Sequence, residues 1–315
     1  MASITVTPLN NGITPAGGAT LAGMLTLNSG ISTAYLYYDT LGEIYYQPDA
    51  ATPATLLLSA GFAITCIGSI FYGTGFSIFM GGVGGNYIWG SIDPTGISTL
   101  APLTEGTVDF TAVAVNIMSW GFTVGNIMGA LFNFDLNTGV VTTLTQFSPV
   151  GLPNGSTLRI SSIKYDVTLD KHLIACTAST NLNPDYSDSV DVAAKALLNF
   201  SAVYYGTPTT TVEYSFIGKN IGLCALGWVE NAAGLKVPKL VVAGEDCKIY
   251  HSDAGLIWTL AISDQALQIN SLTFNTWIFV AGIVYGIVLM STNGSVWESS
   301  YDASLFSDIV DVKAA

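Results

Sequence analysis

Carboxylates are the residues of this 315-residue chain that could do chemistry, because it has 22 acidic residues but only two histidines and a single arginine, Arg159. Two carboxylates on either side of a glycosidic bond can hydrolyse it. The sequence does not pair the candidates across a fold, and solvated loop carboxylates are the favoured interpretation. No catalytic residue is therefore assigned. The candidates, which fall near the starts or ends of expected blades, are Asp109, Asp166, Asp170, Glu230 and Glu245.

The longest polar loop, residues 179–194, carries Asp185, Asp188 and Asp191 among Asn, Ser and Pro. Three carboxylates could hold a Ca²⁺ ion through oxygen ligands. They lack the alternate spacing and the glycine of an EF-hand loop, so a solvated insertion is favoured over a calcium site. A long polar insertion is also a natural place for contact with a partner.

The cysteines and histidines form no metal or redox motif. The four cysteines have no C-x-x-C spacing and lie in apolar, strand-like runs, which is typical of buried free thiols. His172 and His251 are far apart and are interpreted as strand or turn residues. We therefore expect no metal ion and no cofactor. The cysteines are Cys66, Cys176, Cys224 and Cys247.

Charge is scarce and unevenly distributed along the chain. Charged residues make up 10% of the sequence against about 25% in ordinary soluble domains, half of the residues are apolar, and the net charge is -13. A disordered chain has the opposite composition, so the sequence predicts a folded chain. Binding to nucleic acid needs clustered cations, so no nucleic-acid partner is expected. All nine basic residues lie after residue 158. We expect the neutral first half to be covered by an interface centred on residues 20–150, with the loop 179–194 pointing away from it or reaching to a second partner.

The mean hydropathy of +0.50 raises the question of a membrane protein. The most apolar stretches, residues 50–92 and 277–290, are interrupted every few residues by Gly, Ser or Thr and are rich in β-branched and aromatic residues. This pattern favours strands over spanning helices, so no membrane insertion is expected. The first residues have neither a basic start nor an apolar core, so no export signal is expected either.

A turn motif recurs between strand-like runs. An Asp or Asn can bond its own backbone two residues on, and a glycine can take the positive φ that closes a hairpin. The spacing of these turns averages about 50 residues, which is the period of four-stranded propeller blades. The turns are built on Asp39 and Gly42, Asp93 and Gly96, Asp135 and Gly139, Asp253 and Gly255, and Asn293 and Gly294.

The strand pattern predicts an all-β chain that forms one β-propeller domain of six four-stranded blades. The first unit lacks a leading strand in this interpretation, and residues 308–312 have the pattern to supply it. The C-terminal strand would then close the ring and remove the open sheet edges. The expected blades are residues 16–58 with 304–313, 60–103, 108–148, 157–217, 219–263 and 266–300.

Two of the turns end in tryptophan and resemble the Asp-box of sialidase-type propellers, Ser-x-Asp-x-Gly-x-Thr-Trp. Residues 253–258 read Asp-Ala-Gly-Leu-Ile-Trp, with other residues at the motif's Ser and Thr positions, and residues 291–297 read Ser-Thr-Asn-Gly-Ser-Val-Trp, one residue short. The resemblance implies a propeller in which Trp258 and Trp297 pack between blades. It implies no activity, because Asp-boxes are structural.

Sialidases hold the carboxylate of their substrate with three arginines, since a guanidinium pairs with a carboxylate through two hydrogen bonds. One arginine cannot supply this site, so sialidase activity is not expected, although other glycosidase activity is left open.

Composition supplies the remaining functional expectation. The chain resembles the virion proteins of tailed bacteriophages in having little charge, no export signal, many Gly, Ser, Thr and Asn residues and no visible catalytic set. This is an analogy of composition alone. We expect a non-enzymatic structural or adhesive component of the virion, made in the host cytoplasm. It would dock on capsid or tail proteins and offer loops to a neighbour, a host glycan or a receptor. The alternative is an extracellular propeller that binds or cleaves glycans, since sugars stack on aromatic rings and the chain has 15 Tyr and 6 Trp.

Overall fold

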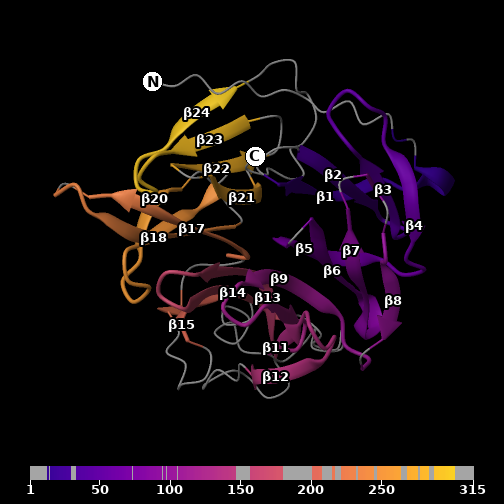
Figure 1. The fold of residues 1–315 in the computed structure, drawn as a ribbon. Coiled ribbons are helices and arrows are strands. Elements are labelled where there is room, and N and C mark those ends of the chain that lie inside the picture. The colour runs from indigo at the N-terminus through magenta and orange to yellow at the C-terminus, as the bar shows by residue number, and fades with distance from the viewer. Residues whose placement is uncertain are drawn as a thin grey trace, which may run out of the picture.

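The chain forms a six-bladed β-propeller (Figure 1). The computed structural model describes residues 13, 15–29, 33–72, 74–93, 95–96, 98–104, 106–146, 157–179, 201–207, 215–216, 221–231, 233–244, 247–263, 268–275, 277–283 and 287–301. Within these residues the regular structure is all strand, apart from two 3-10 turns at Ala16–Gly18 and Val83–Gly85. None of the described helical segments is long and apolar enough to cross a membrane.

Each blade is an antiparallel sheet of four strands that follow one another in the sequence. The first three sheets contain β1 (Leu21–Asn28), β2 (Thr33–Asp39), β3 (Glu43–Gln47) and β4 (Thr55–Ser59); β5 (Ile64–Tyr72), β6 (Gly75–Gly82), β7 (Asn86–Ile92) and β8 (Ala101–Thr104); and β9 (Phe110–Asn116), β10 (Gly121–Asn126), β11 (Ala130–Asp135) and β12 (Val141–Gln146). The last three contain β13 (Thr157–Asp166), β14 (Lys171–Ser179), β15 (Ser201–Gly206) and β16 (Ser215–Phe216); β17 (Leu223–Glu230), β18 (Lys236–Ala243), β19 (Ile249–Ser252) and β20 (Thr259–Ile262); and β21 (Ile269–Asn275), β22 (Ile278–Ile283), β23 (Ile287–Ser291) and β24 (Glu298–Tyr301). Figure 1 shows the sheets around a common centre, with β5, β9 and β21 toward it and β4, β8 and β24 at the periphery.

The first blade differs from the sequence-based prediction. It has its own leading strand, β1, which pairs with β2 from Leu21 to Asn28, so the expectation that this strand is missing is wrong. The outer strand is β4, and the segment Glu43–Gln47 that the sequence placed there is the third strand. Residues 308–312 lie outside the described residues, so their pairing stays a prediction.

The hydrophobic core lies between the blades. Five clusters of buried side chains in the described residues each join two consecutive sheets, from the first and second to the fifth and sixth. Alternate residues of one strand belong to different clusters because successive side chains point to opposite faces of a sheet. In β6, Ile78 and Met80 pack against the first sheet, whereas Phe79 packs against the third.

This packing explains the unusual composition. The middle strands are covered on both faces, so they are apolar at nearly every position, as in the fully buried run of Ile78, Phe79 and Met80. The chain therefore reaches a high mean hydropathy and a low content of charge. The four cysteines are all buried and free, as expected. Burial raises the pKa of Cys66 to about 12.

Hydrogen bonds also cross between blades near the ring centre. The Thr65 hydroxyl of β5 donates to the carbonyl of Phe110 at the start of β9. The Thr111 hydroxyl of β9 donates to the carbonyl of Ile160 in β13 over 2.5 Å. These short polar side chains satisfy backbone carbonyls where the leading strands of neighbouring sheets lie side by side.

The connections alternate between the two faces of the ring. Because the strands are antiparallel and every blade has four, the first-to-second and third-to-fourth connections of all blades open on one face, which we call face 1. The second-to-third connections and the passages to the next blade open on the other, which we call face 2. Any loop of the chain can therefore be assigned to a face by counting strands.

Candidate functional site

The candidate carboxylates in the described residues lie on both faces of the ring. Asp109 lies on face 2 and accepts a hydrogen bond from the backbone N–H of Gly84 over 2.7 Å. Asp166 and Asp170 lie on face 1, in the turn between β13 and β14, and Glu230 is exposed at the end of β17. Glu245 lies outside the described residues.

Asp166 and Asp170 have hydrogen-bond partners that explain their positions. Asp166 is buried; its Oδ1 accepts bonds from the turn, and its Oδ2 accepts one from the Tyr205 hydroxyl over 2.8 Å. The Tyr165 hydroxyl donates to Asp170 over 2.7 Å. Burial, and then each tyrosine's bond to its carboxylate, raises the pKa of Tyr165 and of Tyr205. These contacts describe a braced turn.

The weak calcium candidates, Asp185, Asp188 and Asp191, lie outside the described residues. Within the described ones, no group of three or more His, Cys, Asp or Glu side chains is arranged to hold a metal ion.

The turn motif occupies third-to-fourth strand connections in blades two, three, five and six. Asp93 accepts a bond from the backbone N–H of Thr95, and Asp135 accepts bonds from Asn137 and Thr138. The paired glycines at 96, 139, 255 and 294 all have positive φ, as expected.

The first turn of the series is not equivalent to the others. Asp39 and Gly42 connect β2 to β3, with Asp39 accepting from the backbone N–H of Leu41 and of Glu43. The turn at the equivalent place of the first blade is built on Asp49, which accepts from Ala51 and Thr52. The displaced assignment of Asp39 is why the sequence analysis left a leading strand unaccounted for.

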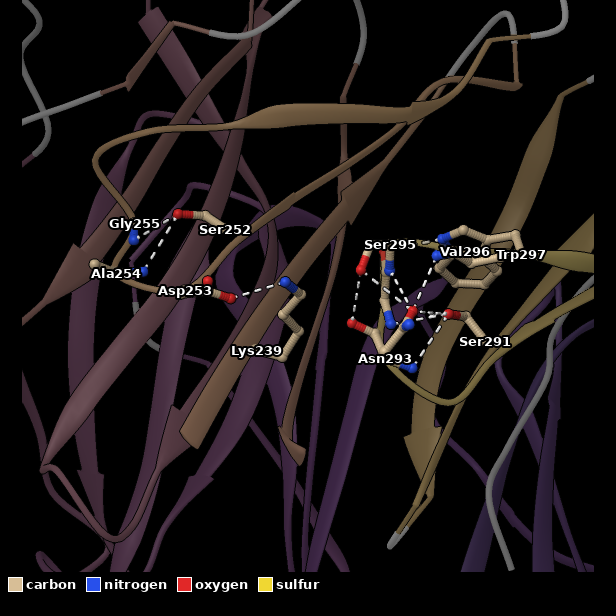
Figure 2. Close-up of polar contacts among 11 residues, drawn as sticks. Lys239, Ser252, Asp253, Ala254, Gly255, Ser291, Asn293, Ser295, Val296 and Trp297 are labelled. Carbon is tan, nitrogen blue, oxygen red and sulfur yellow. Dashed lines mark hydrogen bonds and ion pairs between the residues drawn. The ribbon is translucent and has the colours of Figure 1, made fainter. Parts of the chain in front are cut away.

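The two tryptophan-containing turns share one spacing, Ser-x-x-Gly-x-x-Trp, and Figure 2 shows the serine of each turn, Ser252 and Ser291. Ser252 Oγ accepts a bond from the backbone N–H of Gly255 over 2.9 Å, and Ser291 Oγ accepts one from Gly294 over 2.8 Å. Serine, rather than Asp253, therefore closes the fifth-blade turn. In the sixth-blade turn, Asn293 adds bonds from the two residues after the glycine.

The tryptophans lock these turns onto neighbouring blades. Each indole N–H donates over 3.0 Å to the carbonyl of its turn glycine, from Trp258 to Gly255 and from Trp297 to Gly294. Trp258 packs against the cluster between the fourth and fifth sheets, and Trp297 against the one between the fifth and sixth. Both are half-buried rather than buried.

Asp253 makes an ion pair in place of a turn contact (Figure 2). Its Oδ1 lies 2.8 Å from the ammonium of Lys239, whose side chain is only 9% exposed while that of Asp253 is 72% exposed. The Lys239 stem also passes Gly294 of the sixth blade, where an added Cβ would lie 3.1 Å from Lys239 Cγ. A buried stem and a paired ammonium are the usual arrangement for lysine at such a boundary.

A buried histidine lies between the third and fourth blades. His172 Nε2 is 2.8 Å from the Thr123 hydroxyl, and Nδ1 is buried with no hydrogen-bond partner among the described residues. The Tyr165 ring lies over the imidazole, with centroids 4.8 Å apart. Burial lowers the pKa of His172 to about 4, against an opposing effect of Asp170.

A recess opens between the second and third blades, and sequence reasoning missed it. It has a volume of about 450 Å³ and is lined by Trp89, three hydroxyl side chains and two leucines. β7 supplies Trp89 and Ser91, which lie on one side of the sheet, and Ser77 is the partner of Ser91 on β6. No charged side chain lines it. Its lining residues are Ser77, Trp89, Gly90, Ser91, Thr99, Ala101, Leu103 and Leu136.

Face 1 of blades three to six exposes a set of large apolar side chains, which we call the apolar loop face. On face 2 of the same blades, the described residues expose only Met128. The apolar loop face consists of Ile117, Met118, Trp120, Val140, Val167, Leu169, Leu235, Leu256, Ile257, Trp277 and Val296.

Two tryptophans mark this face. Trp277 is 75% exposed and Trp120 is 50% exposed. Trp120 also has φ +47, a conformation that bulky residues rarely adopt. The turn holds it there through the bond from its own N–H to Ile117 and the bond from the Leu136 N–H to its carbonyl.

Comparison with known proteins adds no assignment. No protein-family model matches the chain, and the search of curated proteins returned no similar sequence.

Proposed function

We propose that this propeller is a non-enzymatic structural or adhesive component of a virus particle, of the tailed-bacteriophage kind, and that it docks on capsid or tail proteins through face 1. The apolar loop face is the observation that supports docking. Composition, with little charge and many small polar residues, is what supports a virus particle.

The exposed tryptophans make face 1 suited to a protein partner. Interface hot spots are enriched in tryptophan. Asp170 and Glu230 are exposed on the same face, and their carboxylates would be repelled by an anionic membrane. We infer a partner surface that combines apolar side chains with cations. This proposal assigns the interface to a face of the ring rather than to residues 20–150.

The test uses particles produced from a genome that lacks this gene, to which the purified chain is added. A variant with Trp120→Asn and Trp277→Ser removes both indoles, and Asn tolerates the positive φ at position 120. The control is Leu56→Ser with Leu260→Ser, which removes two exposed leucines from outer strands. Co-sedimentation should fall at least about tenfold for the face 1 variant and stay unchanged for the control.

Hydrogen exchange on the free and the particle-bound chain provides a second measurement. We expect protection of residues 117–120 and 277 in the particle. A chain that does not associate with particles, or one that is protected on face 2 alone, would contradict the proposal.

A second candidate function is glycan binding by an extracellular propeller. It is favoured by the recess at Trp89, which combines an aromatic ring with hydroxyl groups. Cleavage has no comparable support, because no carboxylate lines the recess.

A further inference from the structure

We propose that the recess between the second and third blades binds a neutral pyranose sugar, with Trp89 as the stacking platform. This inference rests on the glycan-binding candidate and is independent of docking through the apolar loop face. It assigns the ligand class and the residues that recognise it.

The chemistry of the lining matches a neutral sugar on both of its sides. A pyranose has one face of C–H groups, which pack on an aromatic ring, and a rim of hydroxyls, which need donors and acceptors. Trp89 and Leu136 supply the apolar contact, and the hydroxyls of Ser77, Ser91 and Thr99 supply the polar one. A charged sugar would find no counter-charge there.

The platform is held in place before any ligand arrives. The Trp89 ring lies 5.6 Å from the Phe134 ring in an edge-to-face contact. A Cβ added at Gly139 would lie 3.1 Å from Trp89 Cζ3. The third blade therefore braces the indole, and a fixed platform loses little conformational entropy on binding.

The hydroxyl groups are also positioned by the fold. Ser91 Oγ and Thr99 Oγ1 lie 3.0 Å apart, and the Thr99 hydroxyl accepts from the Ser91 backbone N–H. Thr99 can come this close because position 90 is glycine, where an added Cβ would lie 2.6 Å from the Thr99 carbonyl oxygen. No described contact engages the Ser77 hydroxyl, so it is free to bond a ligand.

The size of the recess fits one sugar unit. Small-molecule sites occupy about 300–1,000 Å³, and this recess of about 450 Å³ lies at the lower end. A single stacked sugar with a few hydrogen bonds should bind with a Kd of about 1 mM or weaker, which is sufficient for adhesion when many copies act together.

The test is titration of the full chain, labelled with ¹⁵N at its indoles, with methyl β-D-glucopyranoside, methyl β-D-galactopyranoside and N-acetylglucosamine. Glucuronic acid tests the preference for neutral sugars, and glycerol tests the need for a ring. We expect at least one neutral sugar to shift the Trp89 indole signal, with the Trp277 signal unchanged. Glucuronic acid should bind at least several-fold more weakly, and glycerol should give no shift.

Three variants locate the site. Trp89→Ala should abolish binding, Ser77→Ala should weaken it several-fold, and Trp277→Ala, the matched control, should leave it unchanged. If Trp89→Ala does not fold, Trp89→Phe keeps a smaller ring and should weaken binding. No shift of Trp89 with any of the three sugars, or equal binding by the Ser77→Ala variant and the parent, would overturn the proposal. Particle docking would survive that result, because its tryptophans lie elsewhere.

Discussion

Stability should fall as the pH is lowered, and His172 should account for a measurable part of the loss. The folded-state pKa of about 4 lies below the ordinary value of 6.5, so the folded chain favours the neutral imidazole. The stabilisation is fully present above pH 6.5 and is lost as the pH falls toward 4. Protonation in the fold would place a positive charge on a buried imidazole whose Nδ1 has no described hydrogen-bond partner.

The magnitude follows from the two pKa values. The difference between 6.5 and about 4 corresponds to about 3 kcal/mol when both forms are fully protonated. At pH 5 the unfolded chain is almost fully protonated at this site and the folded chain is not, which gives a loss of about 2 kcal/mol relative to pH 7. The conversion is appropriate because His172 is only 2% exposed.

The assay is urea unfolding of the parent and of a His172→Gln variant at several pH values between 7 and 4.5. The variant has no titrating group at this position, and its amide can still bond the Thr123 hydroxyl. We expect the parent to lose about 2 kcal/mol more than the variant between pH 7 and 5. Carboxylates affect both proteins alike and cancel in the comparison. Parallel pH profiles for the two proteins would refute the reasoning, as would an NMR titration that gave His172 a pKa near 6.5.

The turns and the core give further expectations. Gly294→Ala should lower the free energy of unfolding by about 2 kcal/mol or more, because φ is +71 and the new Cβ would meet Val241 at 2.9 Å. Gly61→Ala, with φ +75 and open space around the new Cβ, should cost about 1 kcal/mol. Equal costs in urea unfolding would contradict the packing argument. Trp297→Ala should lower the free energy of unfolding by about 2 kcal/mol, roughly half the value for a fully buried tryptophan. Trp277→Ala should lower it by less than about 0.5 kcal/mol. The reverse order in thermal unfolding would contradict the burial of Trp297. The four thiols should not react with a thiol reagent in the native chain and should all react after unfolding, because they are buried and free; rapid reaction of any one in the native chain would be inconsistent with the fold.

The architecture was predictable because its signals are local. A turn needs an acceptor side chain and a glycine within a few residues, and the repeat of that chemistry every 50 residues or so indicates blades. The same local character caused the error in the first blade. Asp39 and Asp49 both accept bonds from the backbone two residues on, and nothing in such a turn indicates which pair of strands it connects.

The contacts that define the candidate sites are not local. His172 and Thr123 are 49 residues apart in the sequence, and the recess joins Trp89 to Leu136 of the next blade. A tryptophan in a strand pattern is typically interpreted as core, and Trp89 is partly core, packed on Phe134. The recess beside it also needs Leu136 of the third blade, and which residues meet across two blades follows from packing in three dimensions.

The expectation that an interface covers the neutral first half of the sequence assumed that residues close in the sequence share one surface. In a propeller it does not, since each blade of about 50 residues contributes loops to both faces. Any half of the sequence therefore averages face 1 with face 2. The exposed apolar residues of blades three to six separate when loops are grouped by strand count, with Trp120 and Trp277 on face 1 and Met128 alone on face 2 among the described residues. In a propeller, the loops that share a face are alternate strand connections. They can be identified from the sequence once the strands are numbered correctly.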